Sequence, residues 1–302
     1  MSESTPSLPA PSANQPYVHI SALQAGIIHL PVDLIIQGEP RVYRPCPSLS
    51  FYLAHSASER HNFIFDLGLR KNRDSYPPAA LEHFGTLMPW EVPQSVEESC
   101  VKGGVKPEEV ERVMLSHLHF DHIGDHTPFT KATFVLGGRG KVWLDDGYPG
   151  NPNSRVLSES TPMDRTVFLN PEDFNTSIGP FPHAMDFFGD GSVYVIDTPG
   201  HCPGHINLLV RTSADGSWMY LGGDIAHDTR LLTDPTTHIG HHAESGTPYC
   251  MHTDAAQAEI DIGRVRELVK MPRVEFLIAH DWEWYERNFE RAFLPNRIVP
   301  GK

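Results

Sequence analysis

The chain is short of basic residues. It has 24 lysine and arginine residues against 38 aspartate and glutamate residues, and its formal net charge is −14 with histidine neutral. A nucleic-acid surface needs concentrated positive charge to displace counterions, so we expect no nucleic-acid partner. The sequence also lacks an apolar run long enough to span a bilayer, so we expect no membrane partner. These absences favour a globular protein that acts on a small-molecule substrate.

Cysteine is scarce as well. The four cysteines, Cys46, Cys100, Cys202 and Cys250, are scattered and form no C-x-x-C pair. Free thiols in a reducing compartment account for this pattern, so we predict a cytoplasmic enzyme. Residues 1–16 are rich in serine, proline and alanine but lack basic residues and a hydrophobic stretch. They predict a disordered leader and not a secretory signal.

The remainder, 17–302, shows no fixed-period repeat and no linker, which predicts a single domain. Alternating apolar residues between turn signals predict strands over 17–36, 48–54, 63–66, 112–116, 132–136, 192–197, 206–212, 218–221 and 274–279. Helices are expected over 94–100, from 107, after a Thr253 cap and over 282–293. Residues 146–182 are rich in proline, glycine, asparagine and serine with little periodicity, which predicts a cover insertion.

The stretch 115–122 carries the pattern H-x-H-x-D-H directly after an apolar run. Side chains alternate along an extended segment, so His117 and His119 should point to the same side. Asp121 and His122 follow where the backbone turns and can reach a second point beside the first. A histidine-rich surface loop would not explain four ligand-type side chains at this spacing. The stretch therefore predicts two adjacent metal sites.

Three further candidate ligands follow other apolar strands. His201 comes after the strand at 192–197, Asp224 after 218–221 and His280 after 274–279. Each alone could be an ordinary strand-end residue, but strand ends that converge on one rim can build one site. Asp66 also ends a strand, where it could form a turn or support the metal site. The sequence favours the turn for Asp66.

These motifs together resemble the metallo-β-lactamase superfamily. The matching stretches are S-H-L-H-F-D-H at 116–122, T-P-G-H-x-P-G-H at 198–205, G-G-D at 222–224 and A-H-D at 279–281, so the resemblance spans roughly 45–285. It implies an α/β (α+β) fold, an αββα sandwich of two mixed sheets flanked by helices. It also implies a first metal held by His117, His119 and His201, a second held by Asp121, His122 and His280, and Asp224 bridging both. His205 would then support the site by hydrogen bonding or packing.

Imidazole and carboxylate ligands fit two Zn²⁺ ions, and Mn, Fe or Co can occupy the same set. The oxygen-reducing di-iron branch of the superfamily has glutamate at the second motif position, where this chain has His119. That difference favours hydrolysis by attack of metal-bound hydroxide on a carbonyl, with Asp121 orienting the nucleophile and shuttling the proton. Cys202 does not occupy the cysteine-ligand position of antibiotic-hydrolysing members, which argues against a true β-lactamase.

Within the superfamily the chain looks most like the N-acyl homoserine lactonase branch. Those lactonases carry a tyrosine three residues after the bridging aspartate, and this chain has His227 there. The change puts the acyl homoserine lactone in doubt but leaves ring-opening hydrolysis of a cyclic ester or cyclic amide. His227 would assist catalysis and touch the substrate, although a solvent-exposed turn residue is an equal alternative. Phe120 is the candidate substrate-binding aromatic residue, because it lies inside the stretch 115–122, which we call the metal loop.

Other interpretations stay open at this point. A metal-dependent thioesterase acting on an acyl thioester would use the same ligands, and a non-catalytic metal-stabilised binding protein would keep the metals without turnover. His238, His241 and His242 form a further cluster, which could be a third metal site but is better explained as a solvated loop. Relatives of the lactonase branch suggest a monomer or homodimer.

Overall fold

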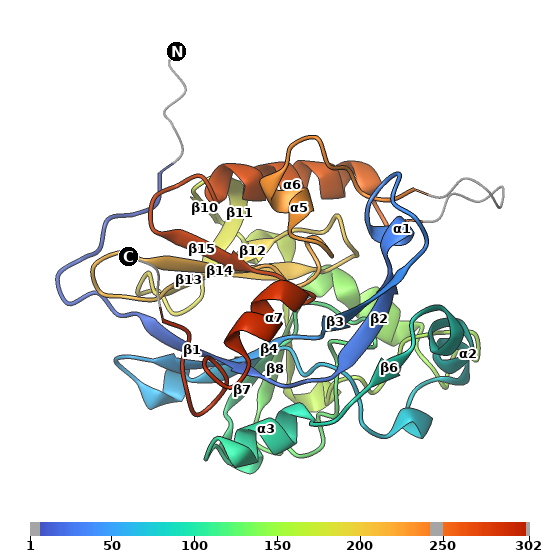
Figure 1. Ribbon diagram of the computed structural model, residues 1–302. Helices are drawn as coiled ribbons and strands as arrows, with labels where there is room; N and C mark the ends of the chain where they lie inside the picture. Colours follow the sequence, from blue (N-terminus) through green and yellow to red (C-terminus); the bar gives the residue numbers. More distant parts are fainter. Residues whose placement is uncertain (1–6, 242–249, 300–302) are drawn as a thin grey trace.

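The computed structural model describes residues 7–241 and 250–299, and these contain two six-stranded sheets stacked face to face (Figure 1). The first sheet has the order β1 (Val18–Leu23), β4 (Ser50–His55), β5 (Phe63–Phe65), β7 (Arg112–Met114), β8 (Thr133–Gly137) and β9 (Thr166–Leu169). The second has the order β10 (Thr176–Ile178), β11 (Phe181–Asp186), β12 (Val193–Asp197), β13 (Ile206–Arg211), β14 (Trp218–Leu221) and β15 (Val274–Leu277). Both sheets are mixed, because β5, β7, β8 and β9 run parallel in the first and β14 and β15 run parallel in the second.

Side-chain alternation along these strands fills two separate layers of core. On β5, Phe63 and Phe65 belong to a buried cluster that also contains Leu208 of β13. This cluster lies between the two sheets. The intervening Ile64 belongs instead to a cluster shared with Ile262. Ile262 lies on α6 (Ala255–Leu268), which covers the outer face of the second sheet (Figure 1). The period of two in the sequence therefore separates an inter-sheet core from helix-covered outer faces.

Helices cover both outer faces. α6 covers the second sheet, and α3 (Val96–Lys102) lies below the first sheet in Figure 1. Ser95 caps α3 by accepting a hydrogen bond from the backbone of Glu98 at 3.2 Å, and Asp254 caps α6 by accepting one from Gln257 at 3.0 Å. The expected αββα sandwich is confirmed.

A smaller three-stranded sheet flanks the sandwich. It consists of β3 (Tyr43–Pro47), β2 (Ile27–Pro31) and β6 (Trp90–Glu91), and α2 (Pro78–Leu87) lies beside it (Figure 1). The end of the predicted strand 17–36 is wrong, because Val32–Ile35 form the short helix α1. That helical turn buries Val32, Leu34 and Ile35 together, which an alternating strand would not do.

Several expected boundaries shift. The predicted helix from 107 is a single 3-10 turn over Pro107–Glu109, and the predicted cap Thr253 gives way to Asp254. The helix α7 (Trp282–Asn288) ends before 293. The range 146–182, predicted to be a cover insertion, contributes β9, β10 and the start of β11 to the two sheets. Its first part, residues 146–165, contributes none of the named strands and includes the loop that borders the candidate substrate cavity described below.

The described part of the expected leader, residues 7–16, contacts the sandwich, which differs from the expected disorder. The buried guanidinium of Arg211 donates to the backbone oxygens of Pro9 and Ala10 at 2.7 and 3.3 Å. Gln15 is also buried and donates to the backbone oxygen of Asp190 at 2.9 Å. Among the described residues, no helix has the length and apolar character needed to cross a membrane.

Candidate metal centre

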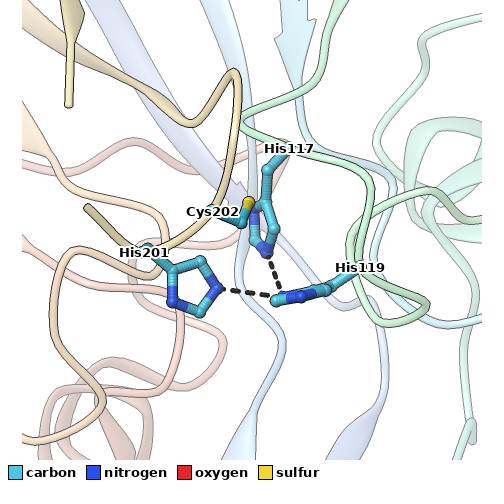
Figure 2. A group of neighbouring side chains, drawn as sticks. All are labelled: His117, His119, His201 and Cys202. Atoms are coloured by element: carbon cyan, nitrogen blue, oxygen red, sulfur yellow. Dashed lines mark hydrogen bonds between the residues drawn. The ribbon is translucent and has the colours of Figure 1, made fainter. Parts of the chain in front are cut away.

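The loop after β7 brings two imidazoles into contact, as the spacing predicted. His117 Nε2 lies 2.8 Å from His119 Nδ1. The loop that follows β12 adds His201, whose Nε2 lies 2.9 Å from the same His119 nitrogen. Figure 2 shows the three rings turned toward one another, with two dashed contacts meeting at His119. Three ring nitrogens from two distant segments thus converge on one point.

Burial keeps these imidazoles in the form that binds metals. It lowers the pKa of His119 to about 4 and holds the pKa of His117 and of His201 well below the ordinary value. Neutral imidazole offers a lone pair to a cation, whereas imidazolium does not. Cys202 is buried beside this group, with its sulfur within 4.8 Å of the ring nitrogens (Figure 2). Burial raises the pKa of the Cys202 thiol well above its usual range, so the thiol stays protonated.

A second group lies beside the first. His122 Nε2 lies 3.1 Å and His280 Nε2 lies 3.2 Å from Asp224 Oδ1. Asp121 Oδ2 lies 3.5 Å from His280 Nε2 and 3.7 Å from His122 Nε2. All four side chains are buried. They come from the metal loop and from the segments that follow β14 and β15, as the sequence predicted.

Asp224 joins the two groups. Its Oδ1 faces the second group, whereas its Oδ2 lies 3.5 Å from His201 Nε2 and 3.7 Å from His117 Nε2. Burial raises the pKa of Asp224, but the imidazoles of His122 and His280 outweigh it and hold the pKa well below the ordinary value. The carboxylate is therefore ionised, with one oxygen directed at each donor group.

The donor set fits a pair of cations. His122 Nε2 and Asp224 Oδ1 are buried and have no hydrogen-bond partner, although they lie close to each other. Buried polar atoms normally find a partner, because an unpaired one costs about 1–3 kcal/mol. A divalent cation between these atoms would remove that cost.

Neighbouring residues hold the imidazole rings of the centre in place. Asp66 Oδ2 lies 2.9 Å from His122 Nδ1 and accepts a hydrogen bond from Ser116 Oγ at 2.7 Å. Asp66 has a φ of 63° directly after β5, and its carboxylate supports the site in place of the turn that the sequence favoured. His205 Nε2 accepts a hydrogen bond from the backbone of Asp224 at 3.1 Å, in agreement with its expected supporting role. These contacts fix ring orientation before any cation binds.

His227 lies inside the centre and is not an exposed turn residue. Its side chain is buried, its Nε2 is 3.3 Å from Asp224 Oδ2, and its Nδ1 has no hydrogen-bond partner. Its ring stacks on His280 with centroids 5.5 Å apart. The sequence did not single out His252, which is also buried here. Its ring centroid lies 5.2 Å from that of His227 and 5.1 Å from that of His201. No motif marks His252, since it precedes α6 and follows no strand.

A cavity of about 440 Å³ opens beside the first donor group. It is lined by His119 and Phe120 from the metal loop, by Phe84 of α2, by Trp143 of α4 (Lys141–Asp145), and by residues of the 151–156 loop. Trp143 stacks over His119 at 5.4 Å, and Phe84 stacks on Phe120 at 4.4 Å. Phe120 thus borders the cavity. A larger cavity of about 760 Å³ beside α7 and β15 contains none of the donor side chains.

The two described members of the other histidine cluster, His238 and His241, do not join the centre. His238 is exposed and lies 3.6 Å from Glu259, and His241 is exposed. His242 lies outside the described residues. The solvated-loop interpretation therefore holds for the two that are described.

Comparison with known proteins places this geometry in a family. The model of the metallo-β-lactamase superfamily matches residues 43–212. Gamma-lactamase MBL2 of Gibberella moniliformis is 34% identical over 242 residues, covering 79% of this chain and 93% of that protein. Metallo-hydrolase mfmC of Annulohypoxylon moriforme is 36% identical over 194 residues, covering 62% of this chain. The chain spans about half the length of mfmC, at 50%, and 30–32% of the next, longer relatives.

Solved structures show the same fold. An N-acyl homoserine lactone hydrolase with the product N-hexanoyl-L-homoserine bound at its catalytic metal centre superposes with a TM-score of 0.65 at 18% identity, covering 93% of this chain and 98% of that one. A family model that matches more than half of the sequence, a similar relative of nearly full length and a shared sandwich agree with one another. The chain belongs to the metallo-β-lactamase superfamily.

Proposed function

We propose that the chain is a dinuclear zinc hydrolase that opens a cyclic ester or cyclic amide, with the cyclic amide favoured. The observation that carries the proposal is Asp224, whose two carboxylate oxygens face two separate groups of imidazole and carboxylate side chains. Paired sites of this kind serve hydrolysis of carbonyl and phosphoryl compounds. The similarity to a protein named gamma-lactamase supports the cyclic amide.

The proposed ligands are the seven side chains expected from the sequence. His117, His119 and His201 would hold one ion, Asp121, His122 and His280 would hold the other, and Asp224 would hold both. Imidazole and carboxylate oxygen suit zinc, which lacks a geometric preference of its own. Bound zinc would make water acidic enough to act as a nucleophile at neutral pH and would polarise the substrate carbonyl.

The protein side chains would then manage protons and orientation. Asp121 lies 3.5 Å from His280 Nε2, where its carboxylate can orient the attacking water and accept its proton. Cleavage of an amide C–N bond leaves a nitrogen that must gain a proton, whereas an alkoxide can leave without one. His227, buried 3.3 Å from Asp224, is placed to supply that proton. Water is consumed, and the products are a carboxylate and an amine on one opened chain.

The cavity beside His119 suits a small substrate with both apolar and polar groups. Trp143 and Phe120 provide flat apolar walls, and Asn151, Asn153 and Ser154 provide polar groups at its edge. Ligand sites commonly combine an apolar lining with a few polar anchors. A cytoplasmic location and a monomeric or homodimeric state stay predictions from the sequence.

The test is a substrate panel with zinc-loaded protein. We expect hydrolysis of five-membered lactams, cyclic carbamates or lactones. The assay would measure the acid formed, and no thiol should appear, since a thiol would indicate thioester cleavage. Asp121→Ala should abolish turnover while the protein stays folded. Faster cleavage of acyl thioesters than of any cyclic substrate would replace the proposal by a thioesterase. A fully loaded protein that is inert toward the whole panel would indicate a binding protein.

A further inference from the structure

The buried His252 contacts one of the proposed zinc ligands through a ring nitrogen. His252 Nδ1 lies 3.3 Å from His201 Nδ1, and the two rings meet edge to face at 83°. The other nitrogen of His201, Nε2, faces His119 and Asp224 at 2.9 and 3.5 Å. His201 therefore uses one ring nitrogen toward the donor group and the other toward His252.

Three other histidines around Asp224 also direct their two ring nitrogens toward different neighbours. Each has Nδ1 close to a neighbouring oxygen and Nε2 turned toward the carboxylates. The Nδ1 neighbours are Ser116 Oγ at 2.9 Å from His117, Asp66 Oδ2 at 2.9 Å from His122 and Pro47 O at 2.8 Å from His280. His201 differs in that its Nδ1 faces an imidazole. An outer partner of this kind fixes both the tautomer and the orientation of a ligating histidine.

We propose that His252 is a positioning residue that accepts the Nδ1–H of His201 and so holds His201 Nε2 ready for zinc. The inference rests on the proposed zinc centre. Two Nδ1 atoms can share a hydrogen bond only when one of them carries the hydrogen. His201 must leave Nε2 unprotonated for a cation, so its hydrogen lies on Nδ1 and His252 Nδ1 supplies the lone pair.

The backbone places His252 at this position. Thr253 donates from its backbone nitrogen to His201 O at 2.8 Å and from its hydroxyl to the same oxygen at 3.1 Å, and Asp254 donates to Gly200 O at 3.1 Å. A Cβ on residue 200 would meet the backbone nitrogen of Ala258 at 2.3 Å, so only glycine lets α6 approach this closely. The T-P-G-H motif and the start of α6 are thereby held together, with His252 facing His201.

An imidazole acceptor also suits the charge of the centre. Asp66, Asp121 and Asp224 already place three carboxylates within or beside the donor groups. A fourth carboxylate opposite His201 would add negative charge that two zinc ions must balance. A neutral imidazole supplies the lone pair without that charge.

The test compares His252→Asn with His252→Leu in the full chain. These two side chains have nearly the same shape, but only asparagine places an acceptor oxygen where Nδ1 lies in histidine. We expect His252→Leu to weaken the binding of one zinc equivalent by about 10- to 100-fold, the usual effect of losing such a partner. His252→Asn should recover most of that loss. Affinities would be measured by competition with a chromophoric chelator.

Controls separate a hydrogen bond from simple packing. His29→Leu removes a half-buried histidine on β2, outside the centre, and should bind zinc as the wild type does. Circular dichroism of the metal-free variants would verify folding, and His252→Ala gives a second acceptor-free variant if His252→Leu fails to fold.

Two results would overturn the inference. One is equal zinc affinity in the wild type and the acceptor-free variants. The other is equal weakening by His252→Asn and His252→Leu, which would mean that packing and not the acceptor matters. The readout is zinc affinity, so a protein that binds two zinc ions but opens no cyclic substrate would contradict the proposed reaction alone.

Discussion

Two clusters of histidine and aspartate lie at opposite ends of the same strands. The candidate metal centre follows the carboxyl ends of β5, β7 and β12, whereas His55, His61 and Asp190 lie at the end of β4 and before β5 and β12. Within the His55 cluster, and within each of the two donor groups of the centre, the ligand-type atoms lie within 4.8 Å of one another. Proximity alone therefore does not separate them.

The difference lies in how the lone pairs are used. His55 Nδ1 accepts a hydrogen bond from the backbone of Ala57 at 3.2 Å, so its proton is on Nε2, toward Asp190 at 3.0 Å and Ser192 at 3.1 Å. At the Asp224 centre, in contrast, two ring nitrogens, His117 Nε2 and His201 Nε2, both converge on the single nitrogen His119 Nδ1. The buried His122 Nε2 and His227 Nδ1 have no hydrogen-bond partner there. We infer that the His55 cluster is a structural hydrogen-bond network and that the Asp224 centre is the one built for cations.

The largest expected effect comes from a matched pair of aspartate substitutions. Asp224→Ala should lower kcat/KM by roughly 10³-fold or more, about 4 kcal/mol of transition-state stabilisation, because both donor groups lose their shared carboxylate. Asp190→Ala should leave kcat/KM unchanged and lower the free energy of unfolding by about 1–3 kcal/mol. Steady-state kinetics and urea unfolding would measure both. A similar kinetic loss in the two variants would break the comparison.

A smaller effect is expected at His227. His227→Phe keeps an aromatic ring against His280 but removes the proton donor, so lactam cleavage should slow by about 10²-fold and lactone cleavage by much less. His227→Tyr restores a donor and should recover part of the lactam rate. The measurement is the ratio of the kcat/KM for a lactam to the kcat/KM for a lactone of matched ring size, in the wild type and in each variant. An unchanged ratio in His227→Phe would remove His227 from the proton transfer.

Removal of metal should destabilise one end of the sandwich. Cations bind the folded state, so chelation should lower the free energy of unfolding. The loss should be about 4 kcal/mol for each site, relative to protein in zinc at 1,000 times the Kd of that site. His55→Asn should lose the same amount on chelation as the wild type, since its cluster holds no cation. Thermal unfolding with and without chelator would measure the difference. A smaller loss of unfolding free energy on chelation in His55→Asn than in the wild type would mean that a cation binds at the His55 cluster, which would contradict the comparison.

The smallest effect is a pH dependence of the metal-free protein. Burial lowers the pKa of His119 to about 4 from an unfolded value near 6.5, so the unfolded chain binds more protons between these values. Stability should therefore fall as the pH drops from about 6.5 toward about 4. His119→Gln should show a shallower decline than the wild type in urea unfolding of chelated protein. Parallel curves for the two proteins would contradict the assigned burial effect.

Much of the candidate centre was predictable because its candidate ligands follow strands. The apolar runs before His117, Asp224 and His280 announce strands, and strands of stacked sheets end at common rims. The resemblance to the superfamily then implied which of these strand-end residues belong to each donor group. Alternation predicted most of the strands, whereas the αββα layering was implied by the resemblance to the metallo-β-lactamase superfamily.

The remainder depends on contacts that leave no local pattern. His252 precedes α6 and reaches His201 only because the backbone around Gly200 packs on that helix. Asp66 fits a turn in the sequence, and only the fold shows His122 beside it. The range 146–182 contains short edge strands among prolines and glycines, and such strands carry too few residues to show a period.

The most direct test of the central claim counts zinc ions. Metal-free protein titrated with zinc should bind two equivalents per chain, and Asp224→Ala should bind at most one equivalent tightly. A wild-type titration that ends at one equivalent, or an Asp224→Ala protein that still binds two with unchanged affinity, would contradict a centre shared through Asp224.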